Sequence, residues 1–577
     1  MTNEEIARVF GEIGEYLEMA GVAFKPQAYN RASAVIAGLE EDVASIYEKG
    51  GLKALEDIPG VGKSLALKIE EYLKTGKIKY YESLKKKTPV DVSELTRIEG
   101  LGPRKIKILY KKLGVRNVDD LEKAASTGKI SKLAGFGKKS EENILKGVFF
   151  AKKFRGRYVL GDKLQWIESV AKDLKTLKEI KKLDVAGSVR RRKETVGDLD
   201  ILAVSSKPKP VMDHFVSRPW VIRVLGKGEA KSSVKAENGM DVDLRVLEEK
   251  SYGAGLLYFT GSKEHNIRLR ELAIKRGLKL NEYGLFKGNK MIAGKAEEEI
   301  YKALGLEYVP PEMREDTGEI QAAAAKKIPK IVDYGSLKGD LQVQTDWSDG
   351  ENSIEEYAAS AIGLGLEYIA ITDHTQSLKV ANGLDEKRLR KQMAEIDRLN
   401  EGFKKKKIDF RILKGAEVDI LKDGSLDLPD EALSKLDIVG VAIHSHFNLP
   451  EKEQTRRLIR AMENKWSDIV FHPTGRLIGE REPLRLDMEA VMKAAKTTGT
   501  VLEIDSYPNR LDLKDEYVRL AVDMGVKLSV DSDSHSIRHF RFLDLGLAQA
   551  RRGWAKKTDI INAWPMEKAL GFLKKNS

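Results

Sequence analysis

The interpretation of this chain rests on residues 187–200, which read Gly187-Ser188-Val189-Arg190-Arg191-Arg192-Lys193-Glu194-Thr195-Val196-Gly197-Asp198-Leu199-Asp200. Short apolar runs at residues 183–186 and 199–204 predict a strand on each side of a basic turn. Asp198 and Asp200 stand two residues apart at the start of the second strand, so both side chains point to the same face of the sheet. Two like charges this close repel each other unless a cation lies between them.

A third carboxylate follows in the alternating segment Met240-Asp241-Val242-Asp243-Leu244-Arg245, where Asp243 is expected on the same face. Three carboxylates suit two Mg²⁺ ions that bridge a triphosphate and an attacking 3′-oxygen, the arrangement for in-line nucleotidyl transfer. A lone Asp-x-Asp more often caps a strand, but the Gly-Ser turn and the arginines before it can bind the phosphates that such ions bridge. The pattern therefore favours a nucleotidyl-transfer site.

A second stretch, from residue 258 to residue 270, is more specific. It reads Tyr258-Phe259-Thr260-Gly261-Ser262-Lys263-Glu264-His265-Asn266-Ile267-Arg268-Leu269-Arg270 and is followed by Asn281-Glu282-Tyr283-Gly284-Leu285. By itself it predicts a strand, a glycine turn and a basic helix, with His265 on the surface. Taken together and in this order, the matched blocks resemble the nucleotidyltransferase superfamily and, within it, the family X DNA polymerases, which are relatives of DNA polymerase beta.

The resemblance assigns a role to each matched residue. It implies that the catalytic carboxylates, which also hold the metal ions, are Asp198, Asp200 and Asp243. It implies that Ser188 and Arg191 bind the triphosphate. The implied nucleotide-binding set, in which the aromatic pair packs on the incoming sugar, the amide meets the base edge and the last arginine lies on the template side, is Tyr258, Phe259, Gly261, Asn266 and Arg270. Arg192 departs from the family, which usually has glycine at that position.

The first third of the chain repeats one pattern three times, in which an apolar residue anchors a Gly-x-Gly turn before a basic amphipathic helix. The glycines are Gly60, Gly62, Gly100, Gly102, Gly135 and Gly137. Such turns present backbone N–H groups to an anion at the start of the following helix, and DNA phosphate is the natural anion. A single turn would more often be a helix C-cap, but three copies in a basic region favour DNA binding. They resemble helix-hairpin-helix motifs, which bind DNA without reading its sequence.

The first copy continues as Gly62-Lys63-Ser64, which could be mistaken for a nucleotide-binding P-loop. That motif requires a glycine where this chain has Asp57, so we reject it. Lys68 follows in the next helix, at the position where relatives with deoxyribose-phosphate lyase activity carry their Schiff-base lysine. A lysine that only contacts phosphate is an equal alternative.

Length, charge and residue usage set further limits. A chain of 577 residues supports several domains. All of the excess positive charge lies before residue 337, while six of the eight histidines lie after it. The absence of cysteine excludes disulfides, thiolate metal sites and cysteine nucleophiles. No apolar run approaches the roughly 20 residues of a membrane span, and the acidic N-terminus does not read as a signal peptide, so a cytoplasmic, nucleoid-associated protein is expected.

Beyond residue 337, strand-like runs alternate with amphipathic helices, which predicts a parallel sheet or barrel. The predicted strands are residues 368–372, 412–416, 438–443, 469–471, 501–504 and 528–530. Most of these strands end in metal-capable side chains, and the carboxyl ends of parallel strands converge on one face. This half resembles the PHP (polymerase and histidinol phosphatase) domain, a distorted βα-barrel with a multinuclear zinc, manganese or iron site. The ligand positions of that family fall on Asp349, His374, Glu417, His444, His472, Asp533 and His535. In such relatives the domain supplies metal-dependent 3′–5′ exonuclease activity, and some also cut at abasic sites.

The opening motif departs from that family, which usually has His-x-His where this chain has Gln342-Val343-Gln344. A neutral amide oxygen is a far poorer ligand for zinc or manganese than an imidazole. Glutamine at the first position occurs in polymerase-linked members, but Gln344 removes a second nitrogen. At least one metal ion is therefore expected to bind weakly or not at all. The domain is then either a nuclease that uses Mn²⁺ or Zn²⁺, or a scaffold that binds DNA.

The sequence thus predicts a multidomain protein with a helical helix-hairpin-helix region, an α/β nucleotidyltransferase palm with thumb and fingers subdomains, and a distorted βα-barrel. The expected boundaries are 1–85 and 86–155 for the helical region, 156–250 for the palm, 251–317 for the nucleotide- and template-binding subdomain, 318–336 for a short helix and linker, and 337–577 for the PHP domain.

The predicted function is gap filling in DNA repair by an Mg²⁺-dependent DNA polymerase. We expect a monomer that acts on gapped or primer-template DNA with deoxynucleoside triphosphates. The alternative from another enzyme class is a phosphoesterase whose polymerase half serves mainly as a DNA clamp. A non-catalytic adaptor for DNA ends is disfavoured, because it needs no set of three aspartates.

Overall fold

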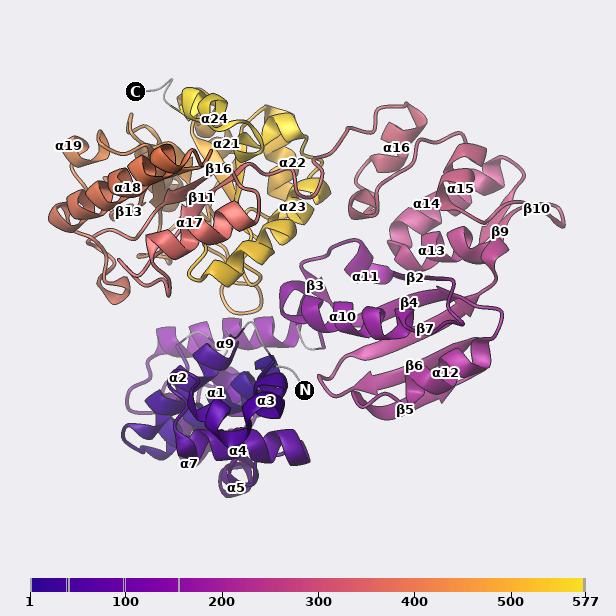
Figure 1. Ribbon diagram of the computed structural model, residues 1–577, viewed down its shortest axis with the longest axis horizontal. Helices are drawn as coiled ribbons and strands as arrows, with labels where there is room; N and C mark the ends of the chain where they lie inside the picture. Colours follow the sequence, from indigo (N-terminus) through magenta and orange to yellow (C-terminus); the bar gives the residue numbers. More distant parts are fainter. Residues whose placement is uncertain are drawn as a thin grey trace. The chain divides into compact units, whose positions relative to one another are not determined.

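The chain forms two compact units, one of residues 1–155 and one of nearly all residues from 156 onward (Figure 1). The computed structural model describes residues 3–37, 39, 42–96, 98, 100–153 and 156–573. Glu99, in the second predicted Gly-x-Gly pattern, and the expected domain ends at 1, 155 and 577 lie outside these ranges. Within them, no helix has the length and apolar character needed to cross a membrane.

Helices and turns make up the described part of the first unit. They are α1 (Asn3–Ala20), α2 (Lys25–Ala37), α3 (Val43–Glu56), α4 (Lys63–Thr75), α5 (Lys79–Lys87), α6 (Val92–Thr96), α7 (Pro103–Leu113), α8 (Val118–Ser126) and α9 (Lys138–Lys153). Apolar side chains from Ile6 in α1 to Val148 in α9 pack into a single core. This core continues across the boundary expected after residue 85, which stays a prediction.

The second unit begins with a five-stranded sheet in the order β2-β4-β7-β6-β5. Its strands are β2 (Lys182–Val185), β4 (Asp198–Val204), β5 (Val221–Lys227), β6 (Lys231–Ala236) and β7 (Asp241–Leu247). The helices of this region are α10 (Leu160–Lys175), α11 (Gly187–Arg190) and α12 (Pro208–Val216). The short strands β1 (Tyr158–Val159) and β3 (Thr195–Val196) pair with each other and hold the turn that precedes β4. The strands predicted on either side of the basic turn are confirmed as β2 and β4.

Residues 252–260 form helix α13 (Tyr252–Thr260), so the strand predicted for this stretch is wrong. A short apolar run does not distinguish a strand from a buried helix, because both faces are covered. Nearly every side of α13 is buried, and a Cβ at Gly253 would lie 2.3 Å from the backbone of Ala296. Tight packing on all sides therefore outweighs the strand preference of Tyr258 and Phe259.

The remaining elements of this region pack around α13. They are η1 (Glu249–Ser251), α14 (Lys263–Lys275), β8 (Lys279–Asn281), β9 (Gly284–Lys287), β10 (Lys290–Ala293), α15 (Glu297–Ala303), η2 (Pro311–Met313) and α16 (Glu319–Ala324). Their core includes Trp554, which comes from far along the chain.

The expectation that His265 lies on the surface is wrong. Its side chain is fully buried, with Nδ1 2.7 Å from a carboxylate oxygen of Glu319 and Nε2 2.8 Å from the hydroxyl of Tyr301. Glu319 lies in α16, the short helix expected in the linker, and it is also fully buried. The segment from 318 onward is therefore packed against α14 rather than free.

The rest of the second unit is a parallel seven-stranded sheet in chain order, surrounded by helices (Figure 1). The strands are β11 (Gly339–Val343), β12 (Tyr368–Ile371), β13 (Arg411–Asp419), β14 (Ile438–Ala442), β15 (Ile469–Val470), β16 (Val501–Asp505) and β17 (Leu528–Asp531). The helices are α17 (Ile354–Gly363), η3 (Lys379–Ala381), α18 (Glu386–Lys406), α19 (Asp430–Leu433), α20 (Glu451–Met462), α21 (Met488–Thr498), α22 (Asp515–Met524), η4 (Ile537–Phe542), α23 (Leu543–Arg552), η5 (Lys557–Asp559), η6 (Ile561–Ala563) and α24 (Met566–Leu573). The amide of Leu341 in β11 donates to Asp531 in β17 at 2.7 Å, so the barrel is nearly closed.

We predict that His265→Ala destabilises the second unit, because it leaves the buried carboxylate of Glu319 with only the amides of Asp316 and Thr317 as donors and opens a cavity. The expected loss of unfolding free energy is about 2–4 kcal/mol. Denaturant unfolding followed by circular dichroism measures it. His446→Ala, which changes an exposed histidine, is the matched control and is expected to leave stability unchanged. Equal stability of the two variants would show that the buried pair of His265 and Glu319 does not stabilise the fold.

Candidate active sites

Strand pairing brings the predicted carboxylates to one edge of the five-stranded sheet. β4 and β7 run parallel, with Asp200 opposite Asp243 and Asp198 opposite Asp241. A Cβ at Gly187 would lie 2.7 Å from a carboxylate oxygen of Asp200, and this glycine has φ +62°. Only glycine lets the basic turn approach the aspartates this closely. The turn and the carboxylates therefore form one site.

The three aspartates bring like negative charges close together in this site. Burial, together with the neighbouring charges of Asp198 and Asp243, raises the pKa of Asp200 to about 6. Lys231 Nζ lies 2.9 Å from Asp243 Oδ2. In the described ranges, the groups whose ligand atoms all lie within 4.8 Å of one another occur in the barrel, and the three aspartates do not form such a group. A cation bound by all three would share the carboxylate of Asp243 with Lys231 or replace Lys231 there.

The arginines of the turn have different partners. Arg190 makes a two-point ion pair with Glu297 in α15, at 2.8 and 2.7 Å, which ties the turn to the next subdomain. Arg191 donates from Nε to Glu315 at 2.9 Å and from Nη1 to the carbonyl of Thr260. Ser188 is half-buried within α11. Of the predicted phosphate ligands, Ser188 directly follows Gly187, the residue that lies against Asp200, and Arg191 is the C-cap of the same short helix.

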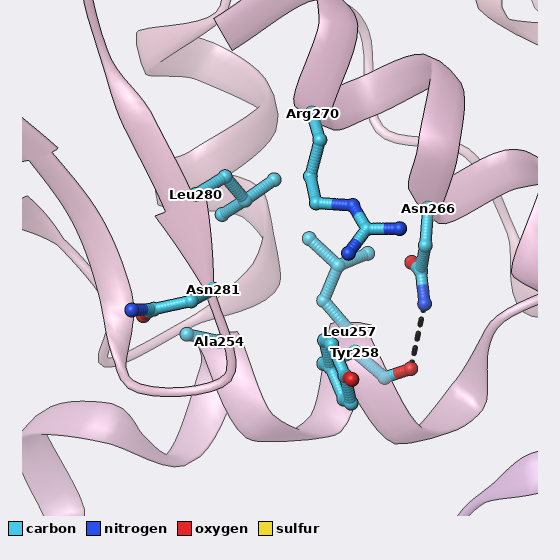
Figure 2. A pocket seen from close by; sticks show the side chains of 7 residues that line it. All are labelled: Ala254, Leu257, Tyr258, Asn266, Arg270, Leu280 and Asn281. Carbon is cyan, nitrogen blue, oxygen red and sulfur yellow. Dashed lines mark hydrogen bonds between the residues drawn. The ribbon is translucent and has the colours of Figure 1, made fainter. Parts of the chain in front are cut away.

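A pocket beside α13 contains most of the predicted nucleotide-binding residues (Figure 2). It is lined by Ala254, Leu257, Tyr258, Asn266, Arg270, Leu280 and Asn281. Asn266 Nδ2 donates to the carbonyl of Tyr258 at 2.7 Å, and the guanidinium of Arg270 lies above the same helix (Figure 2). Phe259 packs edge-on to Tyr258 and lies 4.4 Å from the guanidinium of Arg245. Sequence reasoning missed Arg245, although Arg245 lies two residues after Asp243 in β7 and therefore points to the same face of the sheet.

Gly261 follows α13 directly and contacts the basic turn. It has φ +70°, and a Cβ there would lie 3.1 Å from Arg191 Nη1. This glycine therefore lets the guanidinium of Arg191 approach the end of α13. The predicted phosphate-binding and nucleotide-binding residues thus meet at the Thr260-Gly261 turn.

The three Gly-x-Gly turns of the first unit share one conformation. Gly60, Gly100 and Gly135 have φ of +80°, +79° and +85°. In each turn the amide of the residue between the glycines donates to the carbonyl of the apolar anchor, at 2.9, 2.9 and 3.0 Å. Gly62 and Gly102 then cap α4 and α7 without a side-chain hydrogen bond, and Gly137 precedes α9. These helix N-termini keep amides available for phosphate.

Lys68 lies on α4 just after the first of these turns. Its Nζ donates to the carbonyl and hydroxyl of Ser64 at 3.0 and 3.1 Å and lies 5.6 Å from the ring centre of Tyr80. Partial burial and the nearby charge of Lys25 lower its pKa, which Glu71 partly restores. A lowered pKa increases the fraction of neutral amine, the form that attacks a carbonyl carbon.

The barrel brings its predicted ligands together at the carboxyl ends of the strands. Two overlapping groups have ligand atoms within 4.8 Å of one another: Asp349, His374 and His535, and His374, Glu417 and His444. His472 Nε2 lies 2.7 Å from Glu417, beside the second group. Nδ1 of His472 is buried without a hydrogen-bond partner, and Nδ1 of His374 is buried 3.2 Å from Glu417 Oε2 without forming a hydrogen bond. Such orphaned imidazole nitrogens fit divalent metal ligation.

Glu417 is the central carboxylate of this cluster. Burial alone would raise its pKa, but the imidazoles of His374, His444 and His472 lower it well below the usual range. Burial lowers the pKa of His444, whereas Glu417 and Asp419 together raise it to about 10. Glu417 therefore stays ionised and would serve as a charged ligand to a divalent metal ion.

The two glutamines of the opening motif take other partners. Gln344 Nε2 donates to Glu417 at 2.8 Å, and the reoriented amide of Gln342 donates to Glu503. Asp533 faces Arg510, with 3.6 Å between Arg510 Nε and the carboxylate. An amide N–H of Gln344 thus occupies one side of Glu417. The expectation that at least one metal ion binds weakly or not at all stays a prediction.

Two further carboxylates support this cluster. Sequence reasoning missed Asp419 and noted Asp373 only as a metal-capable residue at the end of a predicted strand. Asp419 accepts a 2.8 Å hydrogen bond from His444 Nδ1, which fixes the orientation of that ring. Asp373 accepts hydrogen bonds from the amides of Thr345 and Ser348 and so holds the loop that carries Asp349. Their adjacency to predicted ligands was the available signal.

Family models match four parts of the chain. The model described as DNA polymerase beta thumb matches residues 255–315, and the PHP domain model matches residues 340–504. A helix-hairpin-helix domain matches residues 1–78, and a SAM-like helix-hairpin-helix tandem matches residues 92–148.

Three relatives match all or part of the chain. It is 39% identical to the DNA polymerase/3'-5' exonuclease PolX of Bacillus subtilis over 581 aligned residues, which cover 100% of both chains. It is 26% identical to DNA polymerase lambda of Arabidopsis thaliana over 54% of this chain and 62% of the relative. A probable phosphatase of Thermoanaerobacter sp. is 33% identical over 32% of this chain and 73% of the relative.

We predict that metal content separates the two barrel groups. His374→Ala removes a ligand of both groups and is expected to abolish binding of Mn²⁺ or Zn²⁺, whereas Asp349→Ala is expected to lose about half of the bound metal. Mass spectrometry of dialysed protein counts the ions. His446→Ala, at the same end of the barrel, is the control and keeps the content of the parent. If His374→Ala keeps the full metal content, then His374 is not a ligand shared by the two groups.

We predict a stability change with pH that comes from Asp200. The raised pKa means that its contribution to stability is fully present below about pH 4 and is lost as the pH rises through about 6. In a chelator, Asp200→Asn should therefore be more stable than the parent above about pH 7, by about 1–3 kcal/mol, and the two should converge near pH 4. Asp213→Asn, at an exposed aspartate whose pKa is lowered, is the control, and an equal gain there contradicts the prediction.

Proposed function

The chain belongs to the family X DNA polymerases that carry a PHP domain, and we propose on this basis that it fills short gaps in DNA and also degrades DNA from its 3′ ends. The identity of 39% over both full chains supports both activities, since the relative is named for both. The observation that carries the polymerase assignment is the register that sets Asp200 opposite Asp243, with Gly187 of the basic turn against Asp200.

In the proposed polymerase reaction, the three aspartates Asp198, Asp200 and Asp243 hold two Mg²⁺ ions. When bound, these ions supply charge neutralisation for the triphosphate and for the attacking oxygen. Ser188 and Arg191 bind phosphate oxygens, and Arg190 keeps the turn in place through Glu297. Tyr258 and Phe259 pack on the incoming sugar, while Asn266 and Arg270 contact the base pair from the pocket of Figure 2.

The proposed nuclease site lies in the barrel. Asp349, His374, Glu417, His444, His472, Asp533 and His535 hold Mn²⁺ or Zn²⁺. Such ions supply an activated water for attack on a phosphodiester. Because Gln344 donates to Glu417, we propose a centre with fewer ions than in relatives with His-x-His, and hence a slower nuclease. Cleavage at abasic sites is the second reaction that this centre could support.

The first unit is proposed to grip the two sides of a gap through its Gly-x-Gly turns. Lys68, with its lowered pKa, is proposed as the lyase nucleophile that removes a deoxyribose phosphate in base excision repair. The DNA substrate would place the protein, as a monomer, on the nucleoid in the cytoplasm.

Primer extension on a one-nucleotide gap tests this function. Asp198→Ala and Asp243→Ala are expected to reduce extension by a factor of about 10³ or more, because the charge that holds the metal ions is lost, and to leave 3′ degradation intact. His374→Ala is expected to abolish degradation and to leave extension intact. Extension that survives in both aspartate variants would contradict the polymerase assignment and favour a nuclease with a DNA clamp.

A further inference from the structure

The barrel contributes a buried arginine to the basic turn of the polymerase site. Arg552 is the last residue of α23, and its side chain is 2% exposed. From Nη1 it donates to the backbone carbonyl of Arg191 at 3.0 Å and to Glu315 Oε1 at 3.1 Å. Its Nη2 donates to Asp515 in α22. One guanidinium thus joins the barrel to the turn and to the segment after η2.

Glu315 is shared between two arginines. The oxygen that accepts from Arg552 also accepts from Arg191 Nε at 2.9 Å, and the second oxygen lies 3.6 Å from Lys193 Nζ. An arginine held at both Nε and Nη1 has a fixed guanidinium plane, because the five donors form a rigid fork. Arg191 is held in this way by Glu315 and by the carbonyl of Thr260. Among the described residues, its Nη2 has no hydrogen-bond partner and is the donor available to an anion.

We propose that Arg552 is a positioning residue for nucleotide binding at the polymerase site. It fixes both the backbone of Arg191 and the carboxylate that orients the Arg191 side chain, so that Nη2 of Arg191 faces the triphosphate before the nucleotide arrives. A pre-oriented donor binds phosphate more tightly, since less freedom is lost on binding. This inference rests on the proposed polymerase function, and it gives the barrel a part in DNA synthesis that does not involve its metal ligands.

The neighbouring arginine provides a matched control. Arg551 lies on the same helix and contacts the same region, donating to Glu312 at 2.9 Å and to the carbonyl of Val332 at 2.6 Å. It has no contact with Arg191 or Glu315 in the described ranges. A general loosening between barrel and palm is therefore expected from changes at Arg551 and Arg552 alike, whereas a positioning role is specific to Arg552.

The test is steady-state gap filling on one-nucleotide gapped DNA, with the full chain and five variants: Arg552→Gln, Arg552→Lys, Arg551→Gln, Arg191→Gln and the double change of Arg191→Gln with Arg552→Gln. Arg552→Gln is expected to raise the KM for the nucleotide about tenfold, with kcat changed less than about threefold. Arg551→Gln is expected to stay within about twofold of the parent in both constants. The double variant is expected to match Arg191→Gln alone, because Arg552 acts through Arg191.

Arg552→Lys guards against a variant that fails to fold, since it keeps the buried positive charge opposite Asp515. It lacks the planar fork whose two terminal nitrogens contact Asp515 and the Arg191 carbonyl at the same time. It is expected to keep the thermal stability of the parent and still to raise KM. Equal KM values for Arg551→Gln and Arg552→Gln overturn the inference, and so does a double variant whose losses multiply. A parent that does not extend the primer contradicts the proposed function itself, which distinguishes the two failures.

Discussion

The polymerase half depends on the parallel pairing of β4 with β7, which forces Asp200 against Asp243 with Asp198 two residues away. This arrangement is unfavourable by itself, since burial and the two neighbouring charges raise the pKa of Asp200 to about 6. The backbone register nevertheless fixes it, because a one-residue slip would turn every buried residue of the central strands outward. The strand pairing therefore outweighs the electrostatic repulsion between the aspartates, and a divalent cation would reduce that repulsion. Gly187 then brings the phosphate-binding turn within contact distance of the same carboxylates.

The barrel also contains a buried carboxylate, but its neighbours there are imidazoles and not other carboxylates. Glu417 is fully buried and surrounded by three imidazoles, which keep it ionised. The strands supply these side chains from neighbouring positions, so the cluster is a consequence of strand order and not of any one loop. Gln344 donates a hydrogen bond to the same carboxylate, so one of its neighbours is a neutral amide.

Sequence reasoning found what depends on short spacing and missed what depends on distant partners. The Asp-x-Asp alternation, the repeated Gly-x-Gly turns and six of the barrel strands were predictable, because each is a local pattern. His265 was placed on the surface because its partner Glu319 lies 54 residues further along the chain. β11 was not predicted, since Asp340 and Gln342 interrupt an apolar run, and both are buried through contacts with β16 and β17. The pairing of Arg552 with Arg191 spans 361 residues, and no local pattern encodes it.

The shared carboxylate of Glu315 also bears on how such a protein evolves. If the barrel were excised, Glu315 would keep Arg191 and Lys193 but lose Arg552, and the carbonyl of Arg191 would be left without its donor. A truncated descendant would need a substitute cation or a smaller side chain at this point. The two enzymes in this chain are therefore not freely exchangeable modules, and a chimaera assembled from unrelated halves would have to restore this junction first.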